Sequence, residues 1–116
     1  MTGLRTDVTP AEPHAETKAQ LAAAVDAARD EIIGLSHLIH ENPEPAFDER
    51  QAAGWIADIL RRHGFEVEHP AGRLETAIRA TRRGGRGGVA PRIGILAEYD
   101  ALPGLGHGCG HNTMAA

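Results

Sequence analysis

Three residues with metal-binding or nucleophilic side chains alternate near the carboxyl end of the sequence. They are His107, Cys109 and His111, separated by Gly108 and Gly110. In an extended segment, side chains two residues apart leave on one face, with Cα atoms about 6.6 Å apart. Thiolate and imidazole are both zinc ligands, and the glycines leave room for an ion. The spacing therefore predicts a metal site for which the three side chains are equivalent candidates.

The same residue types allow other interpretations. A single cysteine is often a small buried apolar residue, and a histidine in a loop is usually a surface residue. A cysteine–histidine nucleophile is a further alternative, although neighbours two apart on a strand are poorly placed for proton transfer from thiol to imidazole. Asp100 follows an apolar run, and α/β sheets bind ligands beyond the carboxyl ends of their strands. The position of Asp100 therefore favours a metal site over these alternatives.

Two helices are expected before the motif. Apolar residues recur at spacings of three and four from Thr17 onward, which predicts one amphipathic helix that Asn42-Pro43 ends. Thr17 and Gln20 are expected to form its capping box. Its apolar stripe consists of Leu21, Val25, Ala28, Ile32, Leu35 and Ile39.

The second helix is expected to begin at Asp48 as N-cap, with Gln51 three residues later, and to end at Gly64. Positive charge at Arg61 and Arg62 suits the carboxyl end of its dipole. Its apolar face consists of Ala52, Trp55, Ile56, Ile59 and Leu60.

Three strands are expected after these helices, at residues 65–68, 76–81 and 92–97, the last with a buried apolar run from Ile93 to Leu96. Helices followed by strands predict an α/β fold, with the two helices packed on the first strands of a mixed sheet. We expect residues 1–15 to form a flexible leader and residues 16–116 to form one domain.

Composition limits the classes of partner. Apolar residues make up 41% of the 116 residues and charged residues 24%, as in ordinary soluble proteins. The net charge is −4, and the basic residues concentrate only between Arg79 and Arg86, so neither nucleic acid nor a membrane is expected as partner. One cysteine excludes an internal disulfide, and no signal peptide or apolar run of about 20 residues is present. The expected compartment is the cytoplasm.

The segment 82–88, Arg-Arg-Gly-Gly-Arg-Gly-Gly, lies between two expected strands. It lacks the lysine and hydroxyl residue of a phosphate-binding loop. A hairpin connection is the favoured interpretation, and an RNA-binding arginine–glycine segment is the alternative. A small metal- or RNA-binding module without catalysis is therefore the rival to an enzyme.

Two segments together resemble a known family. The run from Glu98 through Asp100 to Pro103, followed by His107-Gly108-Cys109-Gly110-His111-Asn112, resembles the first site motif of the aminoacylase/carboxypeptidase metallopeptidases. The likeness is to the amidohydrolase branch, with its hippurate hydrolases, auxin-conjugate hydrolases and dipeptidase-like members. Upstream, His40-Glu41-Asn42-Pro43-Glu44, together with Phe47 and Glu49, resembles a helix-ending segment of the same branch.

The resemblance implies a site for two divalent ions, zinc or manganese, in a larger zinc-peptidase-like catalytic domain. Cys109 would bridge the ions, His111 would bind one of them, and Asp100 would orient a metal-bound histidine. His107 matches a position that is not normally a ligand. Two residues depart from the family pattern, because Glu98 stands where carboxypeptidase-type members have a ligand histidine and Asn112 replaces an aspartate.

The activity implied by the resemblance is hydrolysis of the amide bond of a dipeptide or N-acyl amino acid by metal-activated water. The family's general base and remaining ligands follow its first motif, as does its small dimerisation domain. The chain is therefore expected to be an incomplete and inactive amino-terminal fragment of an enzyme that is a homodimer when intact.

Overall fold

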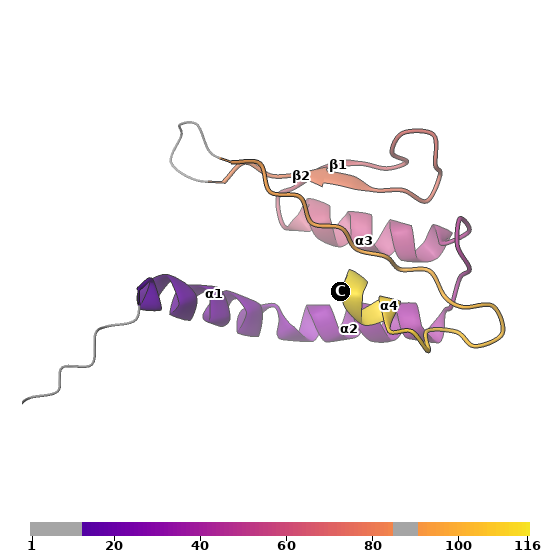
Figure 1. Cartoon of the computed structure of the whole chain (residues 1–116), viewed down its shortest axis with the longest axis horizontal. Helices are drawn as coiled ribbons and strands as arrows, with labels where there is room; N and C mark the ends of the chain where they lie inside the picture. Colours follow the sequence, from indigo (N-terminus) through magenta and orange to yellow (C-terminus); the bar gives the residue numbers. More distant parts are fainter. Residues whose placement is uncertain (1–12, 85–90) are drawn as a thin grey trace, which may run out of the picture. The chain divides into compact units, whose positions relative to one another are not determined.

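The computed structural model describes residues 13–84 and 91–116 and divides the chain into two compact units, Met1–Asp30 and Glu31–Ala116. The described residues form four helices and one two-stranded sheet (Figure 1). The elements are α1 (Ala15–Ala27), α2 (Arg29–Glu41), α3 (Arg50–Arg62), β1 (Glu66–Glu68), β2 (Arg79–Thr81) and α4 (His111–Ala115). No helix within the described ranges is long and apolar enough to cross a bilayer.

Helix α1 differs from the expected first helix in its start and its packing. It begins after His14, a residue with φ +66° that provides no side-chain cap, so the capping box predicted from Thr17 and Gln20 is wrong. Gln20 instead donates to the Glu16 carboxylate at 3.4 Å. Leu21 is 63% exposed and no residue of α1 is buried. Most of the predicted leader, residues 1–12, lies outside the described residues.

The expected single helix is interrupted at Ala28, which separates α1 from α2. No glycine or proline explains the interruption. The predicted end at Asn42-Pro43 is confirmed, because α2 stops at Glu41 and the Asn42 side-chain amide donates to the Leu38 carbonyl at 2.9 Å. That bond satisfies one of the carbonyls that a helix leaves open at its carboxyl end.

The core of the second unit lies between α2 and α3. Leu35 and Ile39 of α2 meet Ala52 and Ile56 of α3, and all four side chains are buried. Burial of such residues stabilises by about 1.5–3 kcal/mol for each large side chain. The partly buried apolar residues packed against this cluster are Trp55, Ile59, Leu60, Ile78, Tyr99, Ala115 and Ala116. The predicted apolar face of the second helix is therefore confirmed.

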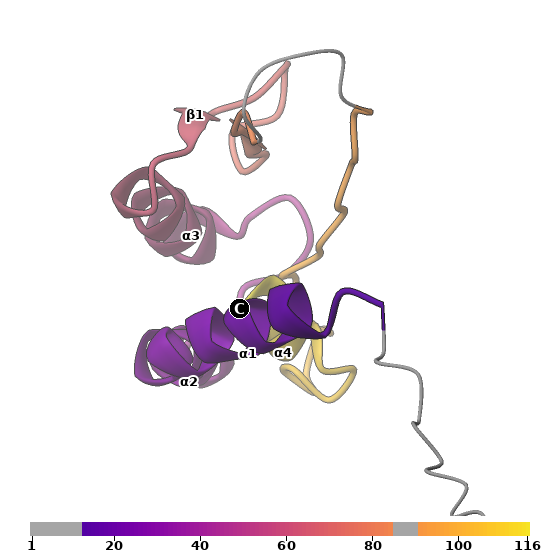
Figure 2. The ribbon, with the colours of Figure 1, turned by 90° about the vertical axis from the view of Figure 1, so that its left-hand side faces the viewer.

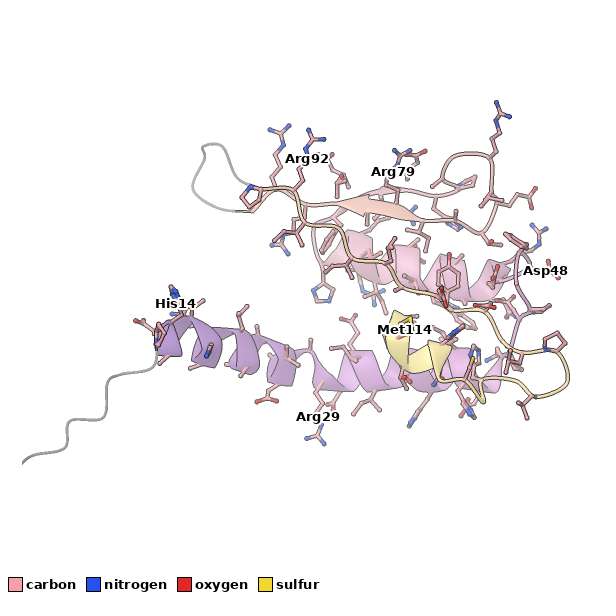
Figure 3. The ribbon with its side chains drawn as sticks, viewed as in Figure 1. His14, Arg29, Asp48, Arg79, Arg92 and Met114 are labelled. Carbon is pink, nitrogen blue, oxygen red and sulfur yellow. The ribbon has the colours of Figure 1, made fainter. Side chains whose placement is uncertain are left out.

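The amino end of α3 is capped by a residue from outside the helix. The Glu44 carboxylate accepts hydrogen bonds from the backbone N–H groups of Gln51 and Ala52, each at 3.0 Å. The prediction of Asp48 as N-cap is wrong, since the N-cap residue is Glu49, without a side-chain cap bond, and Asp48 pairs with Arg50 at 3.1 Å. Figure 3 labels Asp48 in the turn that precedes α3.

The same turn contains a backbone conformation that side chains rarely adopt. Phe47 has φ +67° and is 73% exposed. Left-handed geometry costs a non-glycine residue roughly 1–2 kcal/mol. At the other end of α3, Gly64 has φ +79° and its N–H bonds to the Arg61 carbonyl, as the predicted helix end requires.

The two strands pair antiparallel, with Glu66 opposite Thr81 and Glu68 opposite Arg79. Strand β1 packs on α3, and Figure 1 shows the hairpin lying along that helix. The expected strands at 65–68 and 76–81 are thus present in shortened form. The α/β expectation holds as helices with a small antiparallel sheet, whereas a mixed sheet is not seen in the described ranges.

The expected third strand is wrong for this chain. Residues 92–97 are extended but pair with no strand among the described residues, and Ile93, Ile95 and Leu96 are 84%, 89% and 97% exposed. Figure 2 shows the segment standing apart from α3. Such a strand is buried only when neighbouring strands pair with its edges and helices cover both faces of the sheet, and the described residues supply neither for this segment.

The arginine–glycine segment is described only at its start, because residues 85–90 lie outside the described ranges. Arg82 donates to the His63 carbonyl at 3.0 Å, and its guanidinium carbon lies 5.7 Å from the centre of the Phe65 ring. Arg82 is therefore engaged within the chain, where it contacts His63 and Phe65, just beyond the carboxyl end of α3.

Candidate metal centre

The segment that enters the motif alternates between anchoring and solvent-facing residues. The Tyr99 hydroxyl donates to the Thr76 carbonyl, and burial raises the pKa of Tyr99. The buried Ala101 donates its N–H to the Glu44 carbonyl at 2.7 Å. Because successive residues of extended backbone point to opposite faces, Glu98 and Asp100 share the face away from these anchors.

The loop between Asp100 and His111 is closed by its own backbone. Leu102 and Gly106 exchange two hydrogen bonds, at 2.9 and 3.0 Å, and Gly106 has φ +68°. A Cβ added to Gly108 would lie 3.0 Å from the Leu105 side chain, so the loop is tight at this point. Gly110, with φ +82°, precedes the first residue of α4. These turns bring His111 back to the extended segment.

Asp100 and His111 form the centre of the site. One Asp100 carboxylate oxygen lies 2.8 Å from His111 Nδ1, and the Asp100 carbonyl oxygen lies 3.1 Å from the same nitrogen. Nδ1–H therefore donates to Asp100, which leaves Nε2 as the free ring nitrogen in the neutral imidazole. The hydrogen bond to Asp100 is the largest cause of a raised pKa for His111.

Glu98 approaches the opposite side of the same ring. Its Oε2 lies 3.2 Å from His111 Nε2, so the imidazole stands between two carboxylates. Donor atoms of Glu98, Asp100 and His111 all lie within 4.8 Å of one another. From the sequence, Glu98 stood out only as a departure from a family pattern. Its spacing of two residues from Asp100 is the signal that could have indicated a shared face in extended backbone.

Asn112 fixes α4 against α2. The buried side-chain amide donates to Ser36 Oγ at 3.0 Å and lies 3.3 Å from the Ser36 carbonyl oxygen. Figures 1 and 2 both show α4 beside α2. An amide can donate here where an aspartate could only accept, which gives the departure at position 112 a structural reason. Sequence patterns gave no signal for the Ser36 contact.

The three alternating residues do not share one face, so the expectation of an extended segment is wrong at this point. His107 is buried, neither of its ring nitrogens has a hydrogen-bond partner, and its ring lies 6.3 Å from that of His40. Burial, followed by His40, lowers the pKa of His107. Cys109 is an exposed free thiol, and His111 is half-buried. The turn at Gly108 and the start of α4 at His111 break the alternation.

The donor chemistry present is suited to a divalent ion. Zinc binds thiolate sulfur, imidazole nitrogen and carboxylate oxygen in mixed sites. A histidine whose other nitrogen donates to a carboxylate is the usual arrangement of a metal-bound imidazole. Asp100 and His111 have this arrangement, and Glu98 and Cys109 add oxygen and sulfur donors nearby in the sequence.

Comparison with known proteins shows several hydrolases similar to this chain, although no family model matches it. The chain is 36% identical to the Xaa-Arg dipeptidase of Mus musculus, over 91% of this chain and 28% of that protein. It is 35% identical to thermostable carboxypeptidase 2 of Saccharolobus solfataricus, over 79% of this chain and 26% of that protein. It is 33% identical to the hippurate hydrolase of Campylobacter jejuni, over 67% and 23% respectively.

These relatives carry names of the kind that the sequence motifs predicted, and the chain spans about a quarter of their length. The resemblance inferred from the segments around Glu44 and His111 is therefore confirmed by proteins at 33–36% identity. The chain belongs to the aminoacylase/carboxypeptidase family, in the branch that includes these dipeptidases and amidohydrolases.

Proposed function

We propose that this chain carries the first half of the metal site of a metal-dependent amidohydrolase, which cleaves the amide bond of a dipeptide or an N-acyl amino acid. The observation that carries the proposal is the Asp100–His111 hydrogen bond at 2.8 Å in a sequence 36% identical to a dipeptidase. The substrate class follows from the names of the relatives, a dipeptidase and a hippurate hydrolase among them.

Cys109 and His111 are the proposed metal ligands. His111 would bind through Nε2, since Nδ1 is held by Asp100, which is thereby a positioning residue. Cys109 would bind as thiolate and be shared between two ions. A bound divalent ion, zinc or manganese, would supply Lewis acidity toward the amide carbonyl and toward water. The backbone bond from Ala101 to Glu44 and the Asn112 bond to Ser36 hold the two ends of the site segment in place.

Hydrolysis is expected to need residues that this chain does not contain. No residue before position 97 matches the family's general base, and a metal-dependent hydrolase without a base loses the proton transfer that activates water. We therefore expect negligible turnover of dipeptides or N-acyl amino acids by the 116-residue chain with added zinc or manganese. Robust metal-dependent turnover by the chain alone would contradict this division of the site. The complete enzyme is expected to be a cytoplasmic homodimer.

The test of the function is a chimaera in which this chain replaces the matching segment of the mouse Xaa-Arg dipeptidase. Dipeptide hydrolysis should be retained, should be abolished by a chelator, and should fall strongly in the Cys109→Ala chimaera through loss of metal. The Glu66→Ala chimaera, with a substitution at an exposed residue, is the control for a non-specific loss of activity. Full activity in the Cys109→Ala chimaera would show that Cys109 is not a metal ligand. Hydrolysis unaffected by the chelator would show that the reaction does not depend on a metal.

A further inference from the structure

One contact of the site is not explained by the ligand set of Cys109 and His111. His111 has a carboxylate at each ring nitrogen, Asp100 at Nδ1 and Glu98 at Nε2, at 2.8 and 3.2 Å. A neutral imidazole carries one N–H, and Asp100 accepts it. The nitrogen that faces Glu98 then presents a lone pair to an anion, and this arrangement is unfavourable unless a cation lies between the two.

We infer that Glu98 is a further metal ligand, which binds through its carboxylate the same ion that His111 binds through Nε2. The inference rests on the proposed function, because it assigns a third side chain to the metal site of that function. It goes beyond the Cys109 and His111 ligand set, and it gives Glu98 and Asp100 different tasks: Glu98 binds the ion, and Asp100 orients the imidazole.

The backbone supports this assignment independently of the ring contacts. Tyr99 is hydrogen-bonded to Thr76, and Ala101 is hydrogen-bonded to Glu44. The alternate residues Glu98 and Asp100 therefore project from the opposite face, toward His111. The Glu98 side chain is 67% exposed, which lets its carboxylate adjust to an ion at the roughly 2.0–2.2 Å that zinc–oxygen bonds require. Asp100, at 28% exposure, is held more firmly by its bond to Nδ1.

A proton on Nε2 is the competing cation for the same space. It would make an imidazolium that bridges two carboxylates, with no metal involved. The two cases differ in a direct measurement, because zinc displaces a proton from Nε2 and changes the magnetic resonance signals of the ring, whereas an imidazolium that excludes zinc leaves them unmoved.

The experiment is a titration of the 116-residue chain with Zn²⁺, up to about millimolar concentration, at about pH 7.5, because metal binding depends on pH. Heat of binding gives the affinity, and the ring signals of His111 report which nitrogen is engaged. The variants are Glu98→Gln, which keeps shape and removes charge, and Glu98→Ala. Glu66→Gln, at an exposed carboxylate on β1, is the matched control for lost negative charge. Circular dichroism establishes that each variant is folded.

The expected result is binding by the wild-type chain with a change at His111 Nε2, a loss of at least ~10-fold in affinity in both Glu98 variants, and no loss in Glu66→Gln. Wild-type affinity in Glu98→Gln and Glu98→Ala would overturn the inference and leave the proposed function standing. An equal loss of zinc affinity in Glu66→Gln would also overturn the inference, because the loss would then follow from the lower negative charge of the whole chain. No zinc binding by the wild-type chain, with unmoved His111 signals, would overturn this inference, and a chelator-sensitive chimaera would still support the function.

Discussion

At the scale of single residues, the site depends on how one imidazole ring is held. Asp100 accepts from His111 Nδ1 and so determines which nitrogen is presented to the open side of the site. His107, although it belongs to the same sequence motif, is buried beside His40 and has no hydrogen-bond partner for either nitrogen. Two histidines four residues apart therefore have opposite environments, and the Asp100 bond marks the one suited to bind metal.

Replacement of Asp100 by asparagine tests this dependence. The Asp100→Asn variant keeps the shape of the side chain but removes the charge that favours Nδ1–H, and an asparagine amide can turn its NH₂ toward the ring. We expect zinc affinity to fall by about 10–100-fold, as for other carboxylates that support a metal-bound histidine. Calorimetric titration measures the change. Unchanged affinity would show that Asp100 is not needed to orient His111.

At the scale of elements, Glu44 links helix α3 to the site. Its carboxylate caps the amino end of α3, while its backbone carbonyl accepts from Ala101, the residue next to Asp100. Pro45 and Ala101 also form a parallel bridge. The turn between α2 and α3 thus supports both the core helix and the segment that carries the two site carboxylates.

Substitution of Glu44 should therefore lower the free energy of unfolding by more than substitution of Asp48, which the sequence pattern favours as the N-cap. Glu44→Ala leaves two backbone N–H groups of α3 without acceptors, and loss of a cap typically costs about 1 kcal/mol, within roughly 0.5–2. Asp48→Ala removes only an exposed ion pair with Arg50 and should cost under about 0.5 kcal/mol. Urea denaturation of both variants measures the difference. Equal losses would contradict the assignment of Glu44 as the cap.

A second link between elements joins the start of α2 to the end of α3. The Glu31 carboxylate pairs with Arg62 at 2.5 Å and with His63. The hydrogen bond from Arg62, followed by that from His63, holds the pKa of Glu31 below its ordinary value. A lowered carboxyl pKa means that the contribution to stability is complete above the unfolded-state pKa and is lost as the pH falls through the folded-state pKa.

The Glu31→Gln variant tests this pH dependence of stability. The melting temperature of the wild-type chain should exceed that of the variant at neutral pH, and the gap should close as the pH falls from about 4.3, the ordinary glutamate pKa, toward 2. Thermal melts followed by circular dichroism across this range give the gap. Glu66→Gln is the control, for which no comparable closing is expected. A gap that persists at pH 2 would exclude the ion pairs as its cause.

At the scale of the whole molecule, the structure shows which expectations depended on local chemistry and which on distant neighbours. The end of α2 at Asn42-Pro43, the apolar face of α3 and its end at Gly64 follow from local pattern and are present. The cap by Glu44 and the Ser36–Asn112 contact join residues up to 76 apart, which no local pattern reports. The alternation of His107, Cys109 and His111 misled because a turn replaced the expected extended backbone.

The apolar segment 92–97 is the clearest case of an expectation that needed distant neighbours. Its residues are those of a buried strand, yet Ile95 and Leu96 are almost fully exposed. Exposed apolar patches and unpaired strand backbone promote association. We expect the chain to bind the dye 8-anilinonaphthalene-1-sulfonate, and the Ile95→Ser/Leu96→Ser double variant to bind substantially less without loss of helix. The control is Leu74→Ser, at a half-exposed leucine. Undiminished dye fluorescence in the double variant would place the apolar patch elsewhere.

The turn that contains Phe47 has a further consequence, for how this sequence tolerates mutation. Phe47 is exposed and left-handed, so neither packing nor backbone preference favours an aromatic side chain there. Phe47→Gly should be more stable than Phe47→Ala by about 1 kcal/mol, because only glycine enters this conformation without steric cost, and urea denaturation of the pair measures it. If the two variants are equally stable, the turn relaxes in solution. If glycine is the more stable, the stability of the fold does not determine which residue stands at position 47.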